Sequence, residues 1–340
     1  MIERSDFSIV TDRNAIDDGQ WEQFVREHPR GNILQMPRMF DTYAATPRYH
    51  PLVVACFECE KLLGILVALV QTEYDGLLEK LSARSIIWGG PLAYSDEVVS
   101  ELLSHYNRMV KSRAVYSQVR NLTSLDAARR TPFEKNGFAY EEHLNILVDL
   151  HIGMEGFWRG IKSNRKDGIN KAKKQGFTFE VTGDPIYLEV FYRLLKETYR
   201  DIRMPFPDLE FFVALNKKMP GSVKWFILKK NEEPIIVLNA LADNKILRAF
   251  YIGSSKDPAI LNLRPTDIFH YHVIRWAIEN GYETYDWMGA GKPNEEYGVR
   301  KFKLQYGGGL IEMGRFEKVH KPVTLQISKI GFWCWRKFRR

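Results

Sequence analysis

The sequence predicts an α+β protein with two domains. The chain has 340 residues, and domains hold roughly 150 residues each. Helical and strand patterns are interleaved, and both halves share one order: two helices, antiparallel strands, helix, strand, helix, strand. Hydrophobic residues make up 45% and charged residues 27%, which excludes a disordered or disulfide-rich chain. We therefore place one domain in 1–150, a second in 151–320, and a basic aromatic tail in 321–340.

Apolar periodicity and turn residues define the elements of the first half. Glu58, Glu60 and Lys61 separate two apolar runs, which indicates a hairpin. Gly89-Gly90-Pro91 ends the third strand. The expected helices are 18–28, 36–45, 96–111 and 124–136, and the expected strands are 52–57, 62–70, 83–88, 114–120 and 138–150.

In the second half, the turn pairs Asn231-Glu232 and Asp243-Asn244 separate three apolar runs, which predicts an antiparallel meander. Pro265 suits the first turn of a helix. The expected helices are 154–175, 185–200, 207–218 and 265–280, and the expected strands are 177–181, 223–229, 234–241, 245–252, 282–287 and 309–316.

The positive charge is concentrated in two segments. Residues 158–176 carry a net charge of +6 and residues 315–340 carry +7, whereas the whole chain carries +7. Such localised charge predicts an anionic partner: phosphate, nucleic acid or a membrane surface. The polar N-terminus and the lack of an apolar run of about 20 residues favour a cytoplasmic location. Three cysteines with a single C-x-x-C give no metal site.

Several motifs together resemble a known family. Tyr285-Asp286-Trp287 with Gly289 is followed by Lys301-Phe302-Lys303-Leu304-Gln305-Tyr306-Gly307. Each motif alone is typical of a capping carboxylate or a solvated edge. With the basic helix of 161–176, and with Leu34-Gln35 and Gly89-Gly90-Pro91 in the first half, they resemble the Fem-type branch of the GNAT acyltransferase superfamily. That branch contains the peptidoglycan-bridge aminoacyltransferases and their relatives, and the resemblance covers nearly the whole chain.

The resemblance implies two tandem GNAT-like domains, with mixed, largely antiparallel sheets flanked by helices and a cleft at the junction. It implies acyl transfer to a primary amine of a peptidoglycan or surface-polysaccharide precursor. The donor is an acyl-CoA or an aminoacyl-tRNA, and no cofactor or metal is bound permanently. Asp41 and Pro207 stand where peptidoglycan-acting members carry basic residues, and no acyl-CoA loop is readable, so acceptor and donor stay open.

The residues expected at the site follow from these motifs. Lys303 would neutralise donor phosphate or a developing oxyanion, Asp286 would take or relay the amine proton, and the Tyr251 hydroxyl would reach the cleft. The basic helix would bind a phosphate-bearing substrate. The expected substrate-binding residues are Lys162, Arg165, Lys171, Lys174, Lys301 and Phe302.

Two alternatives stay open. A non-catalytic basic module, or a degenerate acyltransferase scaffold, would contact RNA or acidic polymer without chemistry. The tail 323–340 mixes Trp333 and Trp335 with arginine and lysine, which is typical of a segment lying on an anionic membrane. That contact would make the protein peripheral at the inner face of the membrane. The other interpretation is a helix that packs its tryptophans on the second domain.

Overall fold

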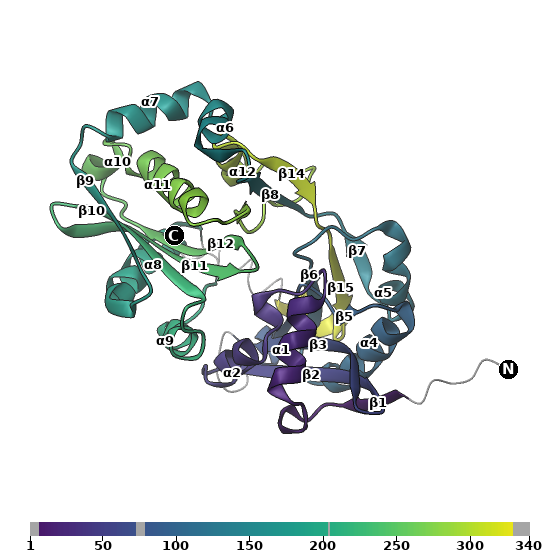
Figure 1. The fold of residues 1–340 in the computed structure, drawn as a ribbon. Coiled ribbons are helices and arrows are strands. Elements are labelled where there is room, and N and C mark those ends of the chain that lie inside the picture. The colour runs from purple at the N-terminus through teal and green to yellow at the C-terminus, as the bar shows by residue number, and fades with distance from the viewer. Residues whose placement is uncertain (1–6, 73–78, 203–204, 329–340) are drawn as a thin grey trace. The chain divides into compact units, whose positions relative to one another are not determined.

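The computed structural model describes residues 7–72, 79–202 and 205–328 (Figure 1). The chain forms two compact units, Met1–Glu142 with Met313–Arg340, and His143–Glu312. The sequence-based boundaries at 150 and 320 differ from these, because residues 143–150 belong to the second unit and residues 313–320 return to the first.

The first unit is built on an eight-stranded sheet in the order β1-β2-β3-β4-β6-β15-β7, with β5 paired to β3. Helices α1 and α2 pack on one face, around Trp21 and Phe40, and α4 and α5 pack on the other, around Tyr106 and Phe133. The strands are β1 (Phe7–Val10), β2 (Tyr49–Glu58), β3 (Lys61–Gln71), β4 (Arg84–Trp88), β5 (Leu92–Ala93), β6 (Tyr116–Arg120), β7 (Ala139–Glu141) and β15 (Arg315–Val319). The helices are η1 (Arg13–Ala15), α1 (Asp18–Glu27), η2 (Ile33–Gln35), α2 (Pro37–Ala44), α3 (Glu79–Ser82), α4 (Asp96–Val110), η4 (Ala127–Arg130) and α5 (Thr131–Lys135).

The second unit is built on a seven-stranded sheet in the order β14-β8-β13-β12-β11-β10-β9. Helices α6, α7 and α11 lie on one face and α8 and α9 on the other (Figure 1). The strands are β8 (Leu144–Asp149), β9 (Phe177–Thr182), β10 (Val223–Lys230), β11 (Glu233–Asp243), β12 (Ile246–Ser254), β13 (Thr284–Asp286) and β14 (Gly309–Glu312). The helices are α6 (Gly153–Gly160), α7 (Ser163–Ala172), η5 (Pro185–Tyr187), α8 (Leu188–Ile202), α9 (Leu209–Lys218), α10 (Pro258–Leu261), α11 (Pro265–Glu279) and α12 (Gly298–Leu304).

The predicted meander is confirmed as β10-β11-β12. Asn231 and Glu232 join the first pair, and Asn244 and Lys245 join the second; all four residues have positive φ. Two-residue turns of this kind match the right-handed twist of the strands they connect. The second turn lies one residue later than the expected Asp243-Asn244.

Three expected elements are each divided in two. The strand at 138–150 is β7 and β8, and the strand at 309–316 is β14 and β15, because the chain passes between the two units at both places. The helix at 154–175 is α6 and α7. Ile161 between them has extended backbone and is buried, and the Lys162 N–H donates to the Gln305 carbonyl instead of continuing α6.

The part of the tail that the structure describes is attached to the first unit. Residues 322–328 are helical, and the Ser328 hydroxyl donates to the Leu81 carbonyl at 2.6 Å. Trp333 and Trp335 lie outside the described residues, so membrane contact stays a prediction. Within the described ranges, no helix is both long enough and apolar enough to cross a bilayer.

Candidate functional site

Two parallel strands of the second unit pair over a short length and then separate. β12 pairs with β13 only from Ile246–Arg248 to Thr284–Asp286. Beyond Arg248, β12 continues along β11 as far as Ser254, whereas the Trp287 N–H donates to the Ile146 carbonyl of β8 at 3.1 Å. The edge of β12 beyond Arg248 is therefore not paired with β13.

A β-bulge lies just past this separation. The register of β11 and β12 shifts between Asn239 and Ala240, because Phe250 is an extra residue in β12. Since side chains alternate along a strand, this extra residue turns Tyr251 onto the same face as Arg248. That face carries α8 and α9, and the Tyr251 ring lies 5.4 Å from the ring of Phe212 of α9.

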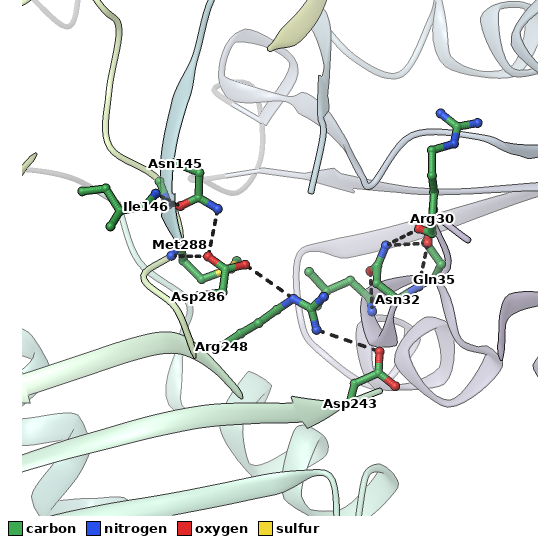
Figure 2. Close-up of polar contacts among 11 residues, drawn as sticks. Arg30, Asn32, Gln35, Asn145, Ile146, Asp243, Arg248, Asp286 and Met288 are labelled. Atoms are coloured by element: carbon green, nitrogen blue, oxygen red, sulfur yellow. Dashed lines mark hydrogen bonds and ion pairs between the residues drawn. The ribbon is translucent and has the colours of Figure 1, made fainter. Parts of the chain in front are cut away.

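Asp286 ends β13 and is buried, with 2% of its surface exposed. Its Oδ1 accepts hydrogen bonds from Asn145 Nδ2 at 2.8 Å and from the Met288 N–H at 2.7 Å (Figure 2). Its Oδ2 lies 3.7 Å from Nε of Arg248 (Figure 2). The carboxylate thus anchors the first turn of the loop that follows β13.

That loop is held by side chains on both sides. Met288 adopts a left-handed backbone conformation, with φ of 54°, which is uncommon for a residue with a side chain. Asn145 Oδ1 accepts the N–H of Gly289 at 2.7 Å, and Lys303 Nζ donates to the carbonyls of Trp287 at 2.6 Å and Gly289 at 2.7 Å. In this strained turn, Asp286 therefore accepts a backbone N–H, and Lys303 donates to backbone carbonyls.

Burial of the Lys303 ammonium lowers its pKa to about 8, and the nearby Asp286 carboxylate opposes this shift. An ammonium group has three N–H bonds, and two of them are used by the carbonyls of the loop. A lysine with a pKa of about 8 can exchange its remaining proton near neutral pH.

Arg300 holds the next part of the same loop. Its Nη1 donates to the carbonyls of Ala290 at 3.2 Å and Lys292 at 2.5 Å, and its Nη2 donates to those of Pro293 at 3.4 Å and Glu295. Arg300 and Lys303, two basic residues of α12, thus donate hydrogen bonds to the backbone carbonyls of this connection.

The first turn of α11 holds a buried carboxylate, Asp267. It pairs with Arg165 of α7 at 2.8 Å and with Arg264 at 2.7 Å, and it accepts the Tyr306 hydroxyl at 2.8 Å. Arg165 also donates to Gln305 Oε1 at 2.5 Å. Two of the three guanidinium nitrogens of Arg165 therefore have internal partners, so its role in binding phosphate stays a prediction.

The other expected substrate-binding residues differ in exposure. Lys162 before α7, Lys171 in α7 and Lys174 after it are exposed. Lys301 is exposed and pairs with Glu296. Phe302 is half-buried and packs against His270, Trp287, Tyr306 and the guanidinium of Arg165.

The structure brings together Asp286, Lys303, Phe302 and Arg165 through the loop after β13, α12 and α11. Tyr251 lies instead in the aromatic group on the α8 and α9 face. Sequence reasoning missed Asn145, Asn239, Arg248 and Arg300. For Asn239 and Arg248 a signal was present, because each is a polar residue inside an apolar strand.

The two first-half motifs of the resemblance contact each other inside the first unit. Gln35 Nε2 donates to the Gly90 carbonyl at 2.8 Å, and Gln35 Oε1 accepts from Asn32 Nδ2 at 2.5 Å (Figure 2). A Cβ at Gly89 would lie 2.3 Å from Asn32 Nδ2, and Gly89 has φ of 77°. Only glycine fits this turn without strain, which explains why the motif is glycine-rich.

Among the described residues, no group of three histidine, cysteine, aspartate or glutamate side chains is arranged to hold a metal ion.

Comparison with known proteins agrees with this geometry. Residues 160–299 match the family model of an acetyltransferase (GNAT) domain. No curated protein matches the chain in sequence. The structure of FemX matches with a TM-score of 0.69 at 16% identity, over 94% of this chain and 100% of that one.

Two further solved structures are similar. A tandem GNAT protein from the clavulanic acid biosynthesis pathway matches with a TM-score of 0.59 at 10% identity, over 93% of this chain and 99% of that one. The C-terminal domain of a putative lysylphosphatidylglycerol synthetase from Agrobacterium fabrum matches with a TM-score of 0.58 at 12% identity, over 92% and 95%. At these identities the likeness is one of fold.

The matched model and the fold define the class: residues 160–299 are a GNAT-type acyltransferase domain, and the fold of the chain is similar to that of a tandem GNAT protein. The fold of the chain is also similar to that of FemX, which agrees at the level of the fold with the Fem-type resemblance found in the sequence.

Proposed function

We propose that the protein transfers an acyl or aminoacyl group to a primary amine of a cell-envelope precursor. The observation that carries this proposal is the separation of β12 and β13 at Arg248 and Asp286. Backbone N–H groups along an unpaired strand edge are fixed donors for a carbonyl oxygen whose negative charge grows during acyl transfer.

The chemistry needs few groups. The neutral amine attacks the ester or thioester carbonyl, a C–N bond forms, and the C–O or C–S bond of the donor breaks. One proton leaves the amine and one reaches the leaving group. Lys303, with its pKa of about 8, is the residue that we assign to proton transfer. Asp286 and Asn145 position the loop beside it.

The acceptor class is supported by two similarities. The sequence resembles the peptidoglycan-bridge aminoacyltransferases, and one similar structure is described as a putative lysylphosphatidylglycerol synthetase. Both point to an amine or hydroxyl acceptor of the envelope, and the attack by an amine fits the N-acyltransferase class of the matched domain.

The first turn of α11 favours an aminoacyl-tRNA over an acyl-CoA as the donor. A helix N-terminus with free N–H groups is a good site for a diphosphate. Here that turn begins with Pro265, which has no N–H, and holds the buried Asp267 carboxylate. The exposed lysines in and beside α7 supply a surface for the phosphates of RNA.

Purified protein incubated with aminoacyl-tRNAs or acyl-CoAs, and with amino-sugar or lipid-linked envelope acceptors, tests the proposal. We expect acylated acceptor with aminoacyl-tRNA, and at least about a 100-fold loss of kcat in Lys303→Met. Lys245→Met, at an exposed ion pair with Glu283, is the matched control and should keep full activity. RNA binding without turnover would instead identify a non-catalytic module.

The tail supplies a separate test of location. If residues 324–340 contact the inner leaflet, full-length protein will co-sediment with anionic vesicles at low salt, and a variant ending at Val323 will not. Equal binding by both would remove the membrane from the proposal.

A further inference from the structure

Asn239 and Arg248 are among the deeply buried side chains of the second unit whose polar atoms have no hydrogen-bond partner in the described residues. Asn239 has 0% of its surface exposed, and neither Oδ1 nor Nδ2 has a partner. Arg248 has 3% exposed, and its Nε and Nη1 have none. Buried polar groups in native proteins are nearly always hydrogen-bonded, so these two need an explanation.

Both side chains lie on the same face of the sheet, next to the bulge. Asn239 is paired with Tyr251 and Leu241 with Arg248, so Asn239 and Arg248 are diagonal neighbours on adjacent strands. Arg248 is also the last residue of β12 that pairs with β13. The unsatisfied groups of Asn239 and Arg248 therefore lie where the two strands separate.

Two other asparagines of this unit, the half-buried Asn216 and the buried Asn145, have hydrogen-bond partners for their amide groups. Asn216 of α9 donates to the Phe212 carbonyl at 2.7 Å and accepts from Trp225 Nε1 at 2.9 Å. Asn145 bonds to Asp286, Ile146 and Gly289. An amide kept for stability has partners, whereas Asn239 has a free donor and a free acceptor.

The charges around Arg248 limit what can bind. Nε lies 3.7 Å from Asp286 Oδ2, and Nη1 lies 3.9 Å from Asp243 Oδ2. One guanidinium between two carboxylates leaves a net negative charge, so an added anion is disfavoured. A neutral group with a carbonyl oxygen suits the free N–H donors of Arg248, and an amide also matches the carboxamide of Asn239.

We propose that Asn239 and Arg248 form a hydrogen-bonding subsite for a neutral amide or ester group of a substrate. The subsite rests on the proposed acyl transfer and adds two substrate-binding residues to it. The group belongs either to the donor, beside its activated carbonyl, or to the acceptor, beside its amine. The KM that changes in the variants identifies which.

The test compares the same substitution at two asparagines. Asn239→Leu should keep its melting temperature within about 2 °C of the wild type, because replacing an unsatisfied buried group with an apolar one is nearly neutral. Its kcat/KM should fall at least about 10-fold, with a raised KM for one substrate. Asn216→Leu should lower the melting temperature by about 4–8 °C and keep its activity. Arg248→Lys retains the cation but not the planar donors, and should follow Asn239→Leu.

A melting temperature of Asn239→Leu as low as that of Asn216→Leu would assign Asn239 to the core and overturn the subsite. Unchanged kcat/KM in Asn239→Leu and Arg248→Lys, in a wild type that is active, would overturn the subsite and leave the proposed function intact. No turnover by the wild type with any donor and acceptor would overturn the proposed function, and the subsite with it.

Discussion

Each of the two units contains a strand, a crossover helix and a second strand parallel to the first. The length over which the two parallel strands pair differs between the units. In the first unit β4 pairs with β6 over the whole length of both strands, and the Gly89 N–H extends the pairing to the Arg120 carbonyl at 2.8 Å. In the second unit β12 and β13 pair over three residues and separate. Of these two strand pairs, only β12 and β13 therefore leave an unpaired strand edge suited to acyl transfer.

The polar groups near each pair differ in the same way. In the first unit the Tyr106 hydroxyl of α4 bonds to Ser85 of β4 and Ser117 of β6, both at 2.6 Å, and so connects the two strands. In the second unit Asn239 and Arg248, next to the separation, have no hydrogen-bond partner among the described residues, and Arg248 forms only long ion pairs with two carboxylates, at 3.7 Å and 3.9 Å. One pair satisfies its polar groups internally, and the other keeps them for a ligand.

The largest effect is expected at the end of β13. Asp286→Ala removes two charge-assisted hydrogen bonds from a buried site, so we expect a loss of about 4 kcal/mol in the free energy of unfolding. With the loop misplaced, kcat should fall about 100-fold. Denaturant unfolding and turnover measure the two quantities.

Arg120→Ala, at the equivalent end of β6, is the control. Its guanidinium packs over the Trp88 ring at 5.0 Å, and its loss should cost about 1 kcal/mol and leave kcat unchanged. Equal losses of activity in both variants would contradict the assignment of the chemistry to the second unit.

We expect Lys303 to make the free energy of unfolding depend on pH, by about 3 kcal/mol. The pKa of its ammonium is about 8 in the folded protein and about 10.5 when unfolded. Between these values the unfolded chain binds a proton that the folded chain does not, so stability rises as the pH goes from 8 to 10.5. Below pH 8 both states are protonated and the contribution is constant.

The stability of Lys303→Met should therefore not rise in this way between pH 8 and 10.5. The measurement is the difference in free energy of unfolding between wild type and variant from pH 7 to 10.5, since other groups titrate equally in both. A difference that does not change with pH would mean that the ammonium keeps its ordinary pKa.

A smaller loss in the free energy of unfolding is expected for a substitution where α7 meets α11. This contact positions the helix that connects β12 to β13. A Cβ at Gly168 would lie 2.0 Å from Asp267 Oδ2 and 2.9 Å from Arg264 Nε. Gly168→Ala should therefore cost about 2 kcal/mol. Gly160→Ala, at the end of α6 with nothing within 4 Å, should be neutral or slightly stabilising. If both variants melt alike, the close approach of the helices is not required.

Sequence reasoning was strongest where periodicity and turns decide the structure. The helix at 265–280 and the meander were predicted because Pro265 and Asn231 mark their ends. The strands at 138–150 and 309–316 were predicted as single elements, because their apolar pattern continues while the backbone changes sheet. No local signal in the sequence reports which sheet a strand joins.

The site was predicted in part. Asp286 and Lys303 were singled out, and the structure brings both to one loop. Their hydrogen bonds to backbone groups that lie 2 to 16 residues away depend on the folded path, and so does the ion pair of Arg165 with Asp267, 102 residues along the chain. Contacts across such distances are set by packing, which a single sequence does not specify.

The smallest effect on the free energy of unfolding is expected at the pair of β4 and β6 in the first unit. Tyr106→Phe removes the hydroxyl that connects Ser85 to Ser117 but keeps the ring, which is fully buried in the core of the first unit. Ser117 keeps His320 Nε2 as a partner at 2.7 Å, and Ser85 loses the hydroxyl of Tyr106, so the loss should be about 1 kcal/mol. Activity should not change, because the chemistry is assigned to the other unit. Urea unfolding and kcat/KM measure this, and a fall in kcat/KM without a fall in stability would show that the first unit takes part in the reaction.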